Sequence, residues 1–122
     1  VTFAMRLQRY DKKDYTITVA GWGGDYNDPM TFMDLFVTNG GNNDAFYSNP
    51  DYDAYIRKAM EGSGDERIDA MIEAEKLLAR DVPIYPLFHP ARVYVQREYV
   101  KGVARFAVGC DTEYKWAYII EH

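Results

Sequence analysis

The sequence has little cysteine or histidine. Its one cysteine, Cys110, excludes an internal disulfide and any metal site built from several thiolates. The two histidines, His89 and His122, stand far apart and lack neighbouring ligands of the same kind. We therefore expect no metal site and no cofactor, and the sequence indicates no role for Cys110.

Clusters of basic residues and long apolar runs are also missing. The formal net charge is −5, and the densest basic pair, Lys12 and Lys13, has acids on both sides. The chain therefore offers no track for phosphates, which argues against a nucleic-acid partner. No apolar run approaches the roughly 20 residues of a membrane helix, and no signal peptide opens the chain. The first residues, Val1–Met5, do not resemble a natural start, so we expect a longer parent protein.

The composition is that of a folded domain. Hydrophobic residues make up 48% and charged residues 27% of the chain, which argues against a disordered tail. Aromatic residues reach 16%, including 11 tyrosines. A tyrosine offers a large apolar face and a polar tip, which suits a surface that binds varied ligands. The same property suits ordinary cores and strands, so both interpretations stay open.

Apolar residues at helical spacing predict four helices. They cover residues 3–13, 28–36, 49–61 and 63–81. Asp28 and Asn49 each precede a proline, as expected of a helix cap followed by a first-turn proline. Ser63 and Glu66 have the spacing of a capping box. The fourth helix is predicted to end near Asp81 and to bury an apolar stripe interrupted by Glu75: Ile68, Met71, Ile72, Leu78 and Ala79.

Segments rich in β-branched and aromatic residues predict strands. They cover residues 15–20, 84–88, 92–96 and 116–120. Pro86 restricts the second of these to a sheet edge or a bulge. Residues 99–114, which contain Gly102 and Gly109, are predicted to form a loop. The mixture of helices and strands fits an α/β or an α+β fold equally well.

Four segments, in the same order along the chain, resemble the oligopeptide-binding proteins of ABC importers, the large solute-binding family with the type II periplasmic-binding fold. They are AGWGGDYNDP at 20–29, YSNPDYD at 47–53, AEKLL at 74–78 with PIYPL at 83–87, and WAYII at 116–120. The resemblance implies that residues 1–91 end the larger, ligand-binding lobe and that residues 92–122 return to the other lobe. It also implies that several times this length of protein precedes the chain.

The resemblance also implies a ligand-binding site. Asp25 matches the acid that pairs with the free α-amino group of a bound peptide, through a charge-assisted hydrogen bond. Removing one partner of a buried pair costs about 3–5 kcal/mol, which would select ligands with a free N-terminus. From spacing alone, Asp25 could instead only shape the turn, or Asp28 could be the important acid.

The neighbours of Asp25 complete the predicted site. Trp22 matches an aromatic residue of the family's cleft, where burial needs no particular partner chemistry; alternatively it is a core tryptophan beneath the turn. Gly23 and Gly24 would let a peptide backbone approach closely and pair as an added strand. A turn that needs positive φ would also explain these glycines.

Two departures from the family pattern leave the ligand open. Val19 stands where close members carry an arginine that holds the C-terminal carboxylate of a short ligand, so the preferred peptide length is undetermined. Gly23 stands where some members have a disulfide-bonded cysteine. The family also includes binders of nickel complexes, haem and sugars, which are the alternative ligands.

Two other function classes are compatible with parts of the sequence. An enzyme could use Asp25 with Asp28, or Asp44 with Asp51, as a carboxylate pair, but no nucleophile and base accompany them. We therefore expect no enzyme; two carboxylates converging in one pocket with raised pKa values would change this. The chain on its own is also expected to self-associate through surfaces that the rest of the protein should cover.

The resemblance thus implies an extracytoplasmic receptor, either periplasmic or a cell-surface lipoprotein. It would bind oligopeptides between two lobes and present the closed form to the permease subunits of an ABC importer. No reaction would occur at the receptor itself.

Overall fold

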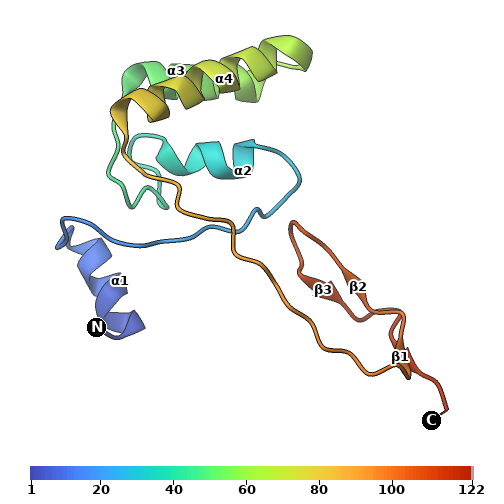
Figure 1. Ribbon diagram of the computed structural model, residues 1–122. Helices are drawn as coiled ribbons and strands as arrows, with labels where there is room; N and C mark the ends of the chain where they lie inside the picture. Colours follow the sequence, from blue (N-terminus) through green and yellow to red (C-terminus); the bar gives the residue numbers. More distant parts are fainter. Residues whose placement is uncertain (122) are drawn as a thin grey trace.

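The computed structural model describes residues 1–121 and contains both helices and strands, as the sequence predicts. The helices are α1 (Phe3–Asp11), α2 (Met30–Met33), η1 (Asp34–Phe36), α3 (Pro50–Glu61) and α4 (Gly64–Asp81). The strands are β1 (Val100–Lys101), β2 (Ala104–Arg105), β3 (Thr112–Glu113) and β4 (Tyr118–Ile119). Helices α2, α3 and α4 pack together at one end, α1 stands apart from them, and two small strand pairs lie at the other end of an extended segment (Figure 1).

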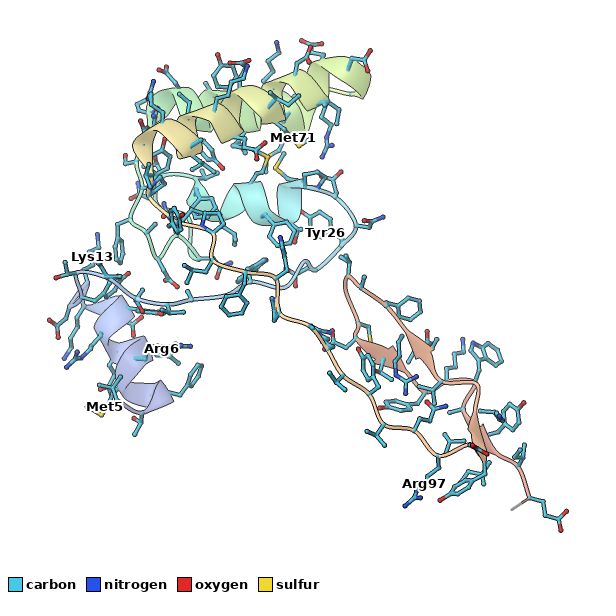
Figure 2. The ribbon with its side chains drawn as sticks, viewed as in Figure 1. Met5, Arg6, Lys13, Tyr26, Met71 and Arg97 are labelled. Atoms are coloured by element: carbon cyan, nitrogen blue, oxygen red, sulfur yellow. The ribbon has the colours of Figure 1, made fainter. Side chains whose placement is uncertain are left out.

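The hydrophobic core lies where α3 and α4 pack against each other and against α2. Seven residues form it: Met30 of α2, Tyr52, Ile56 and Ala59 of α3, and Ala70, Met71 and Ala74 of α4. Three of them are alanines, which let the two long helices approach closely. Met71 points from α4 toward α2 (Figure 2), and the hydroxyl of Tyr52 donates a hydrogen bond to the carbonyl of Met33. The core therefore fixes the position of α2, which follows the predicted site.

The buried stripe of α4 differs from the predicted one. Met71 is buried and Leu78 is half-buried, but Ile68 and Ile72 are 46% and 42% exposed. The alanine face of α4 meets α3, so these two isoleucines lie beside the buried face and stay partly exposed. The prediction was therefore wrong about which face of α4 is buried: the buried face is centred on Ala70, Met71 and Ala74.

The helix starts confirm the predicted cap at Asn49. At α2 the cap position is taken by Pro29 instead of Asp28, and Asp28 contributes a local hydrogen bond just before the helix. The side chain of Asn49 accepts hydrogen bonds from the backbone N–H groups of Asp51 and Tyr52. The carboxylate of Asp28 accepts from the backbone N–H of Met30 at 2.9 Å.

The capping box predicted for α4 was wrong. The side chain of Ser63 makes no capping hydrogen bond, and Glu66 pairs with Lys58 of α3 at 3.3 Å instead. Between them Gly64 has a φ of 54°, a left-handed conformation that departs from the regular first turn a capping box needs.

Three of the four predicted strands were wrong. Residues 15–20, 84–88 and 92–96 have no strand pairing, and side chains such as Ile17 and Val95 are 87% and 98% exposed. A strand needs a hydrogen-bonded partner, and no part of residues 1–121 supplies one to these segments. These segments have the residue composition of strands but lack the backbone hydrogen bonds to a neighbouring strand.

The strands that do form are short and antiparallel. β1 pairs with β4, and β2 pairs with β3. The predicted last strand is confirmed over residues 118–119, whereas the predicted loop at 99–114 was wrong where it contains β1, β2 and β3. None of the helices described is both long enough and apolar enough to cross a bilayer.

Candidate functional site

The predicted site is a turn that links the extended segment 15–20 to α2. Trp22 is 43% exposed, Gly23 and Asp25 are exposed, and Gly24 is half-buried. Within residues 1–121 the carboxylate of Asp25 has no hydrogen-bond or ion-pair partner. The turn therefore presents an aromatic ring and an uncommitted negative charge three residues apart.

The backbone of this turn is held on both sides of the exposed carboxylate. The N–H of Asp25 donates to the Thr31 hydroxyl at 3.0 Å, and Thr31 is only 2% exposed. The N–H of Gly109 donates to the carbonyl of Gly24 at 2.8 Å. Two hydrogen bonds thus fix the main chain at Gly24 and Asp25, while the Asp25 side chain stays free for a ligand.

Gly24 is needed for close packing. A Cβ there would lie 3.1 Å from Val108 Cγ1, 3.3 Å from Thr31 Cγ2 and 3.4 Å from Phe32 Cζ. The alternative explanation from positive φ was wrong, since neither Gly23 nor Gly24 has a positive φ.

Gly23 lies in open space. A Cβ there would meet no atom within 4 Å. Among the described residues, neither its N–H and C=O nor the N–H of Gly24 has a hydrogen-bond partner. Unpaired, accessible peptide groups of this kind are what an extended ligand needs in order to add as a strand.

Asp28 has a different environment from Asp25. Its Oδ1 accepts from Arg67 Nη2 at 2.7 Å as well as from the N–H of Met30. The hydrogen bond from Arg67 and that from Met30 hold the pKa of Asp28 below its ordinary value. A lowered pKa is the opposite of what a general acid needs near neutral pH, so this geometry does not favour a catalytic pairing of Asp25 with Asp28.

Tyr26 adds a neutral hydroxyl beside these acids. Its side chain is 47% exposed, and Figure 2 places it near the start of α2. Partial burial, followed by the charges of Asp34, Asp28 and Asp25, raises the pKa of the Tyr26 hydroxyl. The phenol therefore keeps its proton and can donate a hydrogen bond.

Three supporting residues were missed by the sequence analysis. Arg67 and Gly109 come from segments far along the chain, and no local pattern links them to the turn. Thr31 lies nearby but has no motif of its own. The one available signal was Gly109, a glycine in an apparently irregular segment.

No group of three or more histidine, cysteine, aspartate or glutamate side chains converges as metal ligands within the part of the chain that the structure describes. His122, considered in the sequence analysis, lies outside the described residues.

Comparison with known proteins gives a consistent set of relatives. No family model matches the chain. The oligopeptide-binding protein OppA of Bacillus subtilis (strain 168) is 33% identical over 99 residues, which are 80% of this chain and 18% of that protein. The dipeptide-binding protein DppE of the same organism is 36% identical over 94 residues, or 76% of this chain and 17% of that protein. The chain thus spans less than a fifth of the length of these two curated relatives.

Solved structures extend the similarity to the fold. The substrate-binding domain of an oligopeptide ABC transporter from Bacillus anthracis matches with a TM-score of 0.83 and 36% identity. That match covers 98% of this chain and 24% of the other. OppA of Listeria monocytogenes, solved with a bound peptide, matches with a TM-score of 0.82 and 40% identity, over 98% of this chain and 23% of the other.

Proposed function

Because the chain is related in sequence and in fold to a segment of the oligopeptide-binding proteins of ABC transporters, we propose that it is part of a receptor that binds peptides and delivers them to an ABC importer. The observation that carries this proposal is the match to the Bacillus anthracis structure over 98% of the chain. The relatives' names indicate peptide binding and transport.

The turn supplies a chemical basis for peptide binding. The free carboxylate of Asp25 would accept a charge-assisted hydrogen bond from a peptide's α-ammonium group. The unpaired peptide groups of Gly23 would bond to the peptide backbone, which gives affinity without reading sequence. Trp22 would cover an adjacent side chain of the peptide.

The wider organisation follows from the same proposal. Residues 1–91 would belong to the ligand-binding lobe and residues 92–122 to the other lobe, so the complete cleft needs the rest of the protein. The receptor would work outside the cytoplasm, as periplasmic protein or cell-surface lipoprotein, and would dock on permease subunits. It would release its ligand unchanged.

The test is calorimetric titration of the full-length protein with a mixture of tri- to pentapeptides, both free and N-acetylated. We expect the free peptides to bind and the acetylated set to bind roughly 100-fold more weakly, because acetylation removes the charge that faces Asp25. Equal binding of both sets would refute the proposed role of the α-amine. Absence of peptide binding would refute the peptide receptor and direct the search to nickel chelates, haem or sugars.

A further inference from the structure

The hairpin that joins β2 to β3 touches the candidate site with its tip. The tip comprises residues 106–111 and is closed by a hydrogen bond from the N–H of Phe106 to the carbonyl of Asp111 at 3.2 Å. From this tip, the N–H of Gly109 donates to the carbonyl of Gly24 at 2.8 Å. The neighbouring Val108 lies so close that a Cβ on Gly24 would be 3.1 Å from its Cγ1.

Both sides of this contact use a glycine. Gly109 has a φ of 79°, which disfavours any residue with a Cβ, and a Cβ there would also lie 3.3 Å from the carbonyl oxygen of Asp25. On the opposite side, Gly24 leaves room for the Val108 side chain. The backbones at Gly24 and Gly109 therefore approach closely, and a side chain at either position would push them apart.

The tip is itself braced. Arg92, which precedes the hairpin, forms an ion pair with Asp111, and the Cys110 thiol lies 3.3 Å from the carbonyl of Thr112. Contacts at 110–112 thus restrict the tip that carries Val108 and Gly109. A restrained tip can hold the turn in one position.

We propose that the 106–111 tip is a positioning element for the peptide-binding turn, with Gly109 as its positioning residue. The hydrogen bond from Gly109 occupies the Gly24 carbonyl, so this carbonyl is not available to the peptide. It also fixes the main chain that carries the Asp25 carboxylate. It leaves the peptide groups of Gly23 unpaired for the ligand. This inference rests on the proposed function.

The tip also comes from the other side of the expected lobe boundary. Residues 106–111 belong to the segment 92–122 that we propose returns to the second lobe, whereas Gly24 belongs to the ligand-binding lobe. The contact would therefore connect the two lobes next to the bound peptide. A change that pushes the tip away from Gly24 would then alter ligand affinity without touching the ligand.

A double-mutant cycle in the full-length protein tests the inference. Gly24→Ala places a methyl group against Val108, and we expect roughly tenfold weaker binding of a free tripeptide. Val108→Ala removes the nearest obstructing atom, and alone it should change the affinity by less than about threefold. In the double variant most of the lost affinity should return, because the new methyl group takes the vacated space.

Gly21→Ala is the matched control, since a Cβ on Gly21 meets nothing within 4 Å. The same four variants are also unfolded thermally without ligand. Coupling in both affinity and melting temperature supports the inference. Coupling in melting temperature alone would show a purely structural contact and overturn the positioning role, and no coupling in either would overturn the contact itself. Failure of the wild-type protein to bind any peptide would instead refute the proposed function, whatever the melting temperatures show.

Discussion

Asp25 and Asp28 lie three residues apart and have opposite environments. Asp28 is bonded to Arg67 and to the start of α2, so its charge is used inside the chain. Asp25 keeps its carboxylate free while its backbone is held by Thr31. The two acids thus differ in whether the side chain or the main chain is engaged within the described residues, which is why we propose Asp25 and not Asp28 as the ligand-binding acid.

A pH-dependent contribution to stability is predicted for Asp28. Its pKa is lowered in the folded protein, so its stabilising effect is complete above its ordinary pKa of about 3.9 and is lost as the pH falls through the lower folded value. Asp28→Asn should therefore lower the melting temperature of the full-length protein at pH 7, and the difference from wild type should shrink toward pH 2.

The measurement is thermal unfolding between pH 2 and pH 7. Asn27→Ala serves as control, because it changes a neighbouring side chain without removing a titrating group. A difference between Asp28→Asn and wild type that stays constant across this range would contradict the role of the Arg67 pair.

The sequence predicted candidate site residues, whose role stays a prediction, but it did not predict their surroundings. Asp25 and Trp22 lie three residues apart in the chain, so a motif can include both. Arg67 and Gly109 reach the same region only through the fold, and a hydrogen bond between segments this far apart leaves no periodic pattern in the sequence. Pattern analysis therefore finds the exposed group and misses what positions it.

Among the elements, the prediction succeeded where the stabilising contacts are local. Asn49 and Pro50 begin α3 through bonds within one turn, and Asp28 accepts a similarly local hydrogen bond from the N–H of Met30, where α2 begins. The predicted strands at 15–20 and 84–96 required partners from elsewhere, and the described residues contain none for them. The capping box failed for a related reason, since Lys58 of the preceding helix engages Glu66.

The two helix caps give a matched prediction. Asn49→Ala should destabilise the protein by about 1 kcal/mol, because its side chain accepts from two backbone N–H groups of α3. Its amide also donates to Asp81 at the end of α4, at 2.9 Å, which adds to the loss. Ser63→Ala should change the free energy of unfolding by less than about 0.5 kcal/mol, because Ser63 makes no capping bond.

Urea unfolding of the full-length protein measures both variants. Similar losses for Asn49→Ala and Ser63→Ala would mean that Ser63 does cap α4 in solution. A negligible loss for Asn49→Ala would contradict the observed hydrogen bonds.

For the molecule as a whole, the dominant feature is the large number of apolar side chains exposed on extended segments. The segment after α4 runs away from the helices toward β1 (Figure 1). Arg92, Tyr94 and Gln96 contact the strand pairs, but Val93 and Val95 are 90% and 98% exposed. Extended segments with unpaired backbone and apolar side chains are templates for pairing with another chain. In relatives about four to five times longer, other parts of the protein are available to cover them.

The isolated 122-residue chain is therefore expected to self-associate. Sedimentation velocity should give a mass above that of one chain, and Val93→Lys with Val95→Lys should reduce it, because charges oppose strand pairing. Gln8→Lys with Asn42→Lys adds the same charge at exposed polar positions and should leave the association intact. A monomer at all concentrations would contradict this expectation.

The most direct test of the central claim combines a protein change with a ligand change. Asp25→Asn and wild-type full-length protein are each titrated calorimetrically with one tripeptide, free and N-acetylated. If Asp25 binds the α-amine, acetylation should weaken binding to the wild type by roughly 100-fold and binding to Asp25→Asn by less than about threefold, because the acid that recognises the charge is already gone. An equal penalty for acetylation in both proteins would contradict the account and place recognition of the amine elsewhere.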